Sequence, residues 1–132
     1  MNGNGVVLIV DDHELLARSL VSLFSASGFD AHAVHSGAEA LAFVRSHAAV
    51  ALILLDMSLP DMSGVDVLRA IRTSGGGHSH SLPVVMFSAD DDQASRDELI
   101  RLGATDFASK ANPGGLLRVA SAYVRPSNPP RA

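Results

Sequence analysis

The sequence of 132 residues contains no cysteine, which excludes a disulfide framework, thiol chemistry and a cysteine-ligated metal site. It also has no excess of basic residues, because the net charge is −4, and we therefore expect no direct binding of nucleic acid. No apolar run is long enough for a membrane span, and the first one, residues 6–10, is too short for a secretory signal. These absences favour a cytoplasmic protein that does not contact the membrane.

The length and the apolar content of 47% are sufficient for one domain with a substantial core, but not for two. No internal repeat is visible. We expect the folded domain to cover residues 1–125. The last residues, 126–132, read "PSNPPRA" and are predicted to form a flexible, proline-rich tail.

Short apolar runs alternate with helical patterns along the chain. Strands are predicted at 6–10, 31–34, 50–55, 83–88 and 105–109. Helices are predicted from Glu14 to a stop at Gly28, and at 37–48, 65–72, 91–102 and 116–124. Five βα units in succession predict an α/β protein with helices on both faces of a parallel sheet. The fold expected at this size is the flavodoxin-like three-layer sandwich with strand order 2-1-3-4-5.

Polar side chains stand where four of these strands end. Asp11 and Asp12 follow the first strand, Asp56 the third, Ser88 ends the fourth and Lys110 follows the fifth. The carboxyl ends of parallel strands meet at one edge of the sheet, where ligands of such folds bind. We therefore expect these five side chains to converge. The simpler alternative is that Asp56 is a solvated or capping loop residue.

Three carboxylates in one crevice would repel one another and raise a pKa unless a cation lies between them. Mg²⁺ prefers oxygen ligands, with Asp12 and Asp56 as direct ligands and Asp11 through a water molecule. A carboxylate can also attack phosphorus and form an aspartyl phosphate. Mg²⁺, Lys110 and the Ser88 hydroxyl would then neutralise the charge of the phosphoryl group. Asp56 is the best candidate for the nucleophile, since it stands alone at the end of a central strand, whereas Asp11 and Asp12 form a pair.

Several stretches together resemble a response-regulator receiver domain of two-component signalling, over residues 5 to about 125. The matching stretches read "VDDH", with Arg18 downstream, "LLDMSLPDMSG", "VVMFSA" and "GATDFASK". The resemblance implies that Asp56 accepts a phosphoryl group from a sensor histidine kinase or a phosphotransfer protein. In that case the protein is no enzyme beyond its own phosphorylation and autodephosphorylation.

The resemblance also implies a metal site and a switch. The Mg²⁺ ligands would be Asp11, Asp12, Asp56 and the backbone carbonyl of Ser58. Ser88 and Phe107 would form the switch: the Ser88 hydroxyl moves toward the phosphoryl group and the Phe107 ring rotates inward. The surface of the fourth helix, fifth strand and fifth helix would then bind a downstream effector protein.

The sequence departs from the family pattern after Lys110, where Ala111 stands in place of a proline. A cis bond before Ala111 would cost about 2.5–4 kcal/mol, and we expect it to be trans. Two alternatives stay open: a pseudo-receiver that binds partners without phosphorylation, and a phosphatase of the haloacid dehalogenase type. The second lacks support, since Met57 and Ser58 follow Asp56 where that class has D-x-D. The chain would be a stand-alone receiver or part of a larger protein, as a monomer or weak homodimer.

Other polar residues are expected to have structural or solvated positions. His13 should cap or begin the first helix, and Asp61 should be structural in the turn at 60–64. The connection at 73–83, with three glycines and two histidines, is predicted to be a solvated surface loop. Four charged residues are expected to be solvated rather than paired across a dimer: Arg96, Arg101, Asp106 and Arg118.

Overall fold

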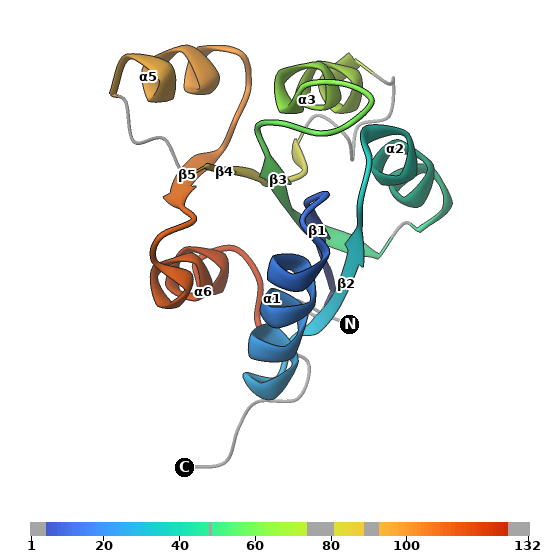
Figure 1. Ribbon diagram of the computed structural model, residues 1–132, viewed down its shortest axis with the longest axis vertical. Coiled ribbons are helices and arrows are strands. Elements are labelled where there is room, and N and C mark those ends of the chain that lie inside the picture. Colours follow the sequence, from blue (N-terminus) through green and yellow to red (C-terminus); the bar gives the residue numbers. More distant parts are fainter. Residues whose placement is uncertain (1–4, 48, 74–80, 89–92, 127–132) are drawn as a thin grey trace.

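The computed structural model describes residues 5–47, 49–73, 81–88 and 93–126, and of residues 93–95 the backbone alone. The predicted histidine-containing loop and the proline-rich tail fall mostly on 74–80 and 127–132, outside the described residues. Five strands form one parallel sheet in the order β2-β1-β3-β4-β5 (Figure 1), as predicted. They are β1 (Val6–Val10), β2 (Asp30–Val34), β3 (Val50–Asp56), β4 (Val84–Ser88) and β5 (Asp106–Ser109).

Helices cover both faces of this sheet. In the described part of the chain they are α1 (Glu14–Ala26), α2 (Gly37–Ser46), α3 (Gly64–Thr73), α5 (Gln93–Arg101) and α6 (Pro113–Ser121). Figure 1 shows α2, α3 and α5 on one face and α1 and α6 on the other. The predicted flavodoxin-like three-layer fold is therefore confirmed. None of the described helices is long and apolar enough to cross a membrane.

The sheet separates two apolar cores, and each central strand contributes to both. In β1, Leu8 and Val10 face the core under α2, α3 and α5, whereas Val7 and Ile9 face the core under α1 and α6. The strand β3 alternates in the same way from Leu52 to Leu55, after an irregularity in its pairing with β1 between Val6 and Val7. Because both of its faces are buried, such a strand consists almost entirely of apolar residues. This is why "VVLIV" and "VALILL" contain no polar position before their terminal acids.

The helix ends follow local capping rules. His13 caps α1, since its Nδ1 accepts a hydrogen bond from the backbone N–H of Leu16 at 3.2 Å, as predicted. After α1, Gly28 has φ of 94°, a left-handed conformation that glycine adopts at low cost. Asn112 caps α6 by accepting from Gly115 N–H at 2.9 Å.

The last helix ends earlier than its apolar pattern predicts. The pattern predicts a helix over 116–124, which includes Tyr123 and Val124, but α6 ends at Ser121. The Tyr123 hydroxyl donates to Oδ2 of Asp106 at 2.9 Å, and Val124 is buried in the core under α1 and α6. These two contacts are made by a turn rather than by a continued helix. The Tyr123 bond also corrects the expectation that Asp106 is a solvated charge, because it pairs the Asp106 carboxylate within the chain.

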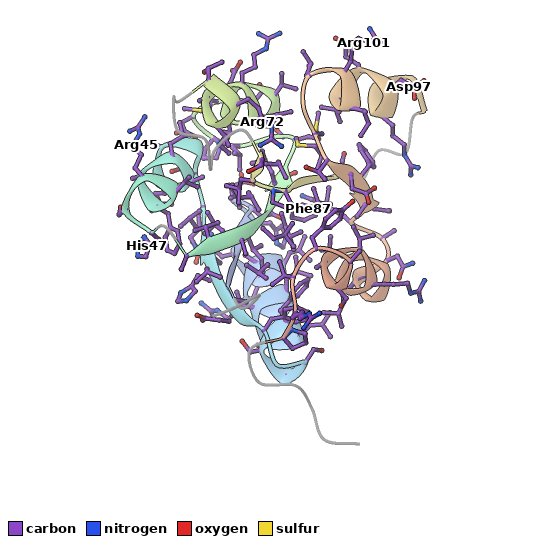
Figure 2. All side chains as sticks on the ribbon, turned by 180° about the vertical axis from the view of Figure 1, so that it is seen from behind. Arg45, His47, Arg72, Phe87, Asp97 and Arg101 are labelled. Atoms are coloured by element: carbon purple, nitrogen blue, oxygen red, sulfur yellow. The ribbon has the colours of Figure 1, made fainter. Side chains whose placement is uncertain are left out.

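Arg72 joins three segments at the amino-terminal edge of the sheet. Its guanidinium donates to the carbonyl of Leu82 at 2.7 Å and to that of Gly103 at 2.8 and 3.0 Å. Figure 2 shows this side chain lying against the body of the molecule, whereas Arg101 projects away from it. Arg72 therefore connects the end of α3 to the start of β4 and to the turn between α5 and β5.

Replacing Arg72 with methionine is expected to lower the free energy of unfolding by about 1.5–3 kcal/mol. The change removes hydrogen bonds from a charged donor and leaves two carbonyls without it. Urea denaturation followed by circular dichroism measures the loss. Arg69→Met is the matched control, because Arg69 is exposed one turn earlier on the same helix. An equal loss in both variants would contradict the structural role of Arg72.

Candidate functional site

The pairing of β1 with β3 brings two acidic residues together at the carboxyl edge of the sheet. Val10 pairs with Leu55, so that Asp11 and Asp56 come next on neighbouring strands. Asp11 is fully buried and Asp56 is only 4% exposed, and they are the buried charged residues of the described chain. Asp12 is exposed beside them. The solvated-loop alternative for Asp56 is therefore wrong, because a loop carboxylate in water would not be buried.

Backbone contacts hold the Asp11 side chain and main chain in place. Oδ1 of Asp11 accepts a hydrogen bond from the backbone N–H of His13 at 2.9 Å. The backbone N–H of Asp11 donates to the carbonyl of Val34 at 3.1 Å. The other carboxylate oxygen, Oδ2, is buried and faces Lys110. Asp11 is thus fixed with one oxygen directed into the site.

Lys110 lies between the two buried carboxylates. Its Nζ is 3.0 Å from Oδ1 of Asp56 and 3.3 Å from Oδ2 of Asp11. The ammonium also lies 5.3 Å from the centre of the Phe87 ring, within cation–π distance. Asp56 and Asp11 each carry a negative charge when ionised, so one lysine leaves the pair with an excess of negative charge.

The segment after β5 positions Lys110 without a proline at the next residue. The backbone N–H of Lys110 donates to the carbonyl of Ser88 at 3.0 Å, and Ala111 N–H donates to Oγ of Ser109 at 3.1 Å. No described peptide bond is cis, so the bond before Ala111 is trans, as predicted. Hydrogen bonds to β4 and β5 therefore set the direction of this loop.

The electrostatics of the site favour a bound cation. Burial raises the pKa of Asp56 above its ordinary value of 3.8, and the nearby Asp11 raises it further, although the hydrogen bond from Lys110 opposes them. For Lys110, burial alone would lower the pKa, but the hydrogen bond and charges of Asp56 and Asp11 raise it overall. The ammonium of Lys110 is thus held charged, but its single positive charge does not balance the negative charge of the carboxylates.

One oxygen from each of Asp11, Asp12 and Asp56 lies within 4.8 Å of the others. Three carboxylate oxygens at this spacing suit a hard divalent cation such as Mg²⁺, which prefers oxygen donors and usually retains water ligands. The donor set contains no nitrogen or sulfur ligand that would favour zinc or copper. The residues present therefore fit the metal that the sequence predicts.

Three other predicted site residues belong to β4, β5 and the loop after β3. Ser88 is half-buried at the end of β4, beside Ser109 of β5. Phe107 is half-buried and packs against the core under α5, with the guanidinium carbon of Arg96 4.8 Å from its ring centre. Ser58 is exposed in the loop after β3, whose backbone closes through a bond from Gly64 N–H to the carbonyl of Met57 rather than that of Ser58.

Sequence reasoning missed Phe87 and His35. Phe87 lies in the interior (Figure 2) and contacts the ammonium of Lys110. The only signal for it was an aromatic residue directly before Ser88. The ring nitrogen Nδ1 of His35 lies 3.0 Å from the carbonyl oxygen of Asp11, a contact that joins residues 24 apart in the chain and has no local signal.

The chain is similar to proteins of one family. The family model described as "Response regulator receiver domain" matches residues 7–120. The sensory transduction protein RegX3 of Mycolicibacterium smegmatis is 42% identical over 105 residues, which cover 79% of this chain and 43% of the relative. The DNA-binding response regulator MtrA of the same organism is 36% identical over 104 residues, covering 79% and 43%. The chain thus spans less than half the length of these curated relatives.

A solved structure has the same fold. The chemotaxis protein CheY4 of Vibrio cholerae superposes with a TM-score of 0.83 at 24% identity, covering 92% of this chain and 99% of that chain. At this identity the likeness concerns the fold alone. It agrees with the strand order and with the two helical layers described above.

Proposed function

This chain belongs to the response-regulator receiver domain family, and on that premise we propose that Asp56 is its phosphoacceptor. The phosphodonor would be a sensor histidine kinase or a phosphotransfer protein that carries a phosphohistidine. One observation carries the proposal: the buried Asp56 carboxylate has an ammonium at 3.0 Å and two further aspartates within metal-ligand spacing. A structural aspartate has no need of that arrangement.

The proposed reaction transfers one phosphoryl group. A lone pair on a carboxylate oxygen of Asp56 forms a bond to phosphorus, and the P–N bond of the donor breaks. Its electron pair returns to the imidazole nitrogen of the donor, which becomes neutral or takes a proton from water. Hydrolysis later returns the carboxylate and inorganic phosphate, so that the protein is not consumed and acts on no other substrate.

The surrounding residues have separate roles in this proposal. Asp11, Asp12, Asp56 and the backbone carbonyl of Ser58 would hold Mg²⁺. When bound, the metal ion would neutralise charge on the phosphoryl oxygens. Lys110 is already directed at the Asp56 carboxylate, and it would stabilise a second phosphoryl oxygen without rearranging. The Ser88 hydroxyl would bind a third.

The switch would use Ser88 and Phe107. Attraction of the Ser88 hydroxyl to the phosphoryl group would vacate space into which the Phe107 ring turns. Support comes from the half-buried position of Phe107 between the core and Arg96. The surface of α5, β5 and α6 would then change its affinity for an effector protein.

The proposed partners are proteins rather than DNA. MtrA is named as a DNA-binding regulator, but the match covers 43% of that protein. With a net charge of −4, this chain has no excess of positive charge to hold phosphates. We propose that it acts in the cytoplasm as a monomer or weak homodimer, either alone or within a larger regulator.

Intact-mass spectrometry after incubation with Mg²⁺ and acetyl phosphate tests the proposal. The wild type should gain the mass of one phosphoryl group. Asp56→Asn and a wild-type sample with EDTA should gain none. Asp66→Asn is the matched control, because it removes the same charge from an exposed position on α3 and should be phosphorylated normally.

Failure of the wild type with both acetyl phosphate and a phosphorylated histidine kinase would favour the pseudo-receiver. Steady turnover of a small phosphate ester would instead favour the haloacid dehalogenase alternative. A gain that persists in Asp56→Asn would assign the acceptor to another residue.

A further inference from the structure

The first turn of α2 and His35, the residue before its cap, contact the two loops that carry the proposed metal ligands. The turn itself is closed by a variant of the capping box: Ser36 Oγ accepts from Glu39 N–H at 3.1 Å, and Glu39 Oε1 accepts at 2.8 Å from the N–H of His35, one residue before the Ser36 cap. This arrangement satisfies the backbone N–H groups of His35 and Glu39. It leaves the N–H groups of Gly37 and Ala38 for partners outside the helix.

Asp61 supplies both of these partners from the loop between β3 and α3. Its Oδ1 accepts from Gly37 N–H at 2.8 Å and its Oδ2 from Ala38 N–H at 2.9 Å. The pKa of Asp61 lies below its ordinary value because these backbone N–H groups stabilise the charged carboxylate. Although Asp61 is exposed, each of its oxygens therefore has a defined partner 23 or 24 residues earlier in the chain.

The loop that Asp61 attaches to α2 is short and closed. Gly64 N–H donates to the carbonyl of Met57 at 2.8 Å, and Ser58 and Ser63 form an antiparallel bridge. A side chain at Gly64 would collide with the carbonyl oxygen of Asp56, so only glycine fits there. The closed loop thus links the position of Asp61 to that of Ser58.

The loop is also packed against α2 by an apolar contact. A methyl group placed on Gly37 would overlap the side chain of Met62, which follows Asp61. The absence of a side chain at Gly37 is therefore what permits the loop to approach the helix. The loop therefore contacts α2 in two ways: Asp61 accepts hydrogen bonds from the helix, and Met62 packs against Gly37.

His35 makes the second connection, to the loop between β1 and α1. Its Nδ1 lies 3.0 Å from the carbonyl oxygen of Asp11. A carbonyl can only accept, so Nδ1 carries the proton and donates it. The same residue is linked through its backbone N–H to Glu39 at the start of α2.

We propose that His35 and Asp61 are positioning residues, which use the first turn of α2 to hold the Asp11 and Ser58 loops at the spacing that Mg²⁺ requires. The inference rests on the proposed function, because it assumes that these loops bind the metal. Neither side chain would touch the ion. Each would act as an outer contact that keeps a ligand-bearing segment in place, a role that affects metal affinity in other sites.

Mg²⁺ affinity, measured without any phosphodonor, separates this role from ordinary helix capping. The dissociation constant comes from an NMR shift titration of the ¹⁵N-labelled protein with MgCl₂. In Asp61→Asn one acceptor becomes an NH₂ group that faces a backbone N–H. We expect Mg²⁺ binding to weaken about tenfold, as found when outer contacts of metal ligands are removed.

Two further variants test the same connection without removing a charge. Gly37→Ala should displace Met62 and weaken Mg²⁺ binding in the same direction. His35→Phe keeps a ring but loses the donor to Asp11, and it should also weaken binding. Asp66→Asn, which changes the net charge as Asp61→Asn does, should bind Mg²⁺ like the wild type.

Thermal denaturation of each variant completes the test. The proposal would be overturned if Asp61→Asn and Gly37→Ala unfolded at lower temperature but bound Mg²⁺ with wild-type affinity. Asp61 would then be a helix cap only. Equal weakening in Asp66→Asn would overturn it too, since net charge would then explain the effect. If the wild type bound no Mg²⁺, the proposed metal site would fail, and the inference with it. Normal Mg²⁺ binding by the wild type but not by Asp61→Asn would support both.

Discussion

Asp56→Asn is expected to make the protein more stable than the wild type at neutral pH in the absence of divalent cations. The variant removes a buried negative charge that Asp11 repels, while Lys110 keeps Asp11 as its partner at 3.3 Å. The expected gain in the free energy of unfolding is about 1–3 kcal/mol, as for other replacements of buried charge by neutral groups. A residue that the proposed function needs would therefore be unfavourable for folding.

The pH dependence of this difference gives the sign of the effect. The folded protein raises the pKa of Asp56 above 3.8, so it binds the proton more tightly than the unfolded chain does. The corresponding stabilisation of the wild type is complete below pH 3.8 and is lost as the pH rises through the folded pKa. The advantage of Asp56→Asn should thus be near zero at about pH 3 and should grow as the pH is raised toward neutrality, through the folded pKa of Asp56.

Urea denaturation at both pH values measures the difference, with Asp66→Asn as the control for a change of one charge. Added Mg²⁺ should stabilise the wild type more than Asp56→Asn, because binding to the folded state alone adds to its stability. An Asp56→Asn variant that is less stable than the wild type at neutral pH would show that the ion pair with Lys110 outweighs burial and repulsion.

Lys110→Met is expected to have two large effects of different origin. Without the ammonium, two buried carboxylates face each other, and the free energy of unfolding should fall by about 3 kcal/mol. Phosphorylation of Asp56 should also slow about 100- to 1000-fold, as when one preorganised group that stabilises transition-state charge is removed. The stability loss is measured by denaturation, and the rate by the time course of intact mass with acetyl phosphate.

Saturating Mg²⁺ distinguishes the two effects. A divalent cation between the carboxylates should restore much of the stability of Lys110→Met. It should not restore the phosphorylation rate, because no positive charge replaces the ammonium at its position. Arg118→Met is the matched control, since it removes a positive charge from an exposed position on α6 and should change neither quantity appreciably. If Mg²⁺ restored the rate as well, Lys110 would serve only to balance charge.

The fold and the acidic centre were accessible from the sequence because both depend on local signals. Buried parallel strands are continuous apolar runs, and an acid directly after such a run marks the carboxyl edge of the sheet. Asp11, Asp12 and Asp56 are of this kind. The order of the strands could be predicted from the general preference of parallel sheets at this chain length for one topology.

Contacts between distant segments were not accessible in this way. Nothing near Asp61 indicates that its carboxylate accepts from Gly37 and Ala38, and only the general expectation of a structural role could be stated. The end of α6 was misplaced for a similar reason: the apolar pattern continued to Val124, but the Tyr123–Asp106 bond is made across the fold. Helical periodicity records which residues are buried, not whether the backbone that buries them is still helical.

The alignment of β1 with β3 has a consequence for which sequence changes the protein tolerates. Asp11 and Asp56 lie side by side only because Val10 pairs with Leu55. One residue inserted into or deleted from the regularly paired part, Val7–Val10 or Leu52–Leu55, would move one acid away from the other and exchange the residues that face the two cores. Connections between the elements can vary in length without this effect. Natural length variation among related sequences should therefore fall in the connections and spare these two strands.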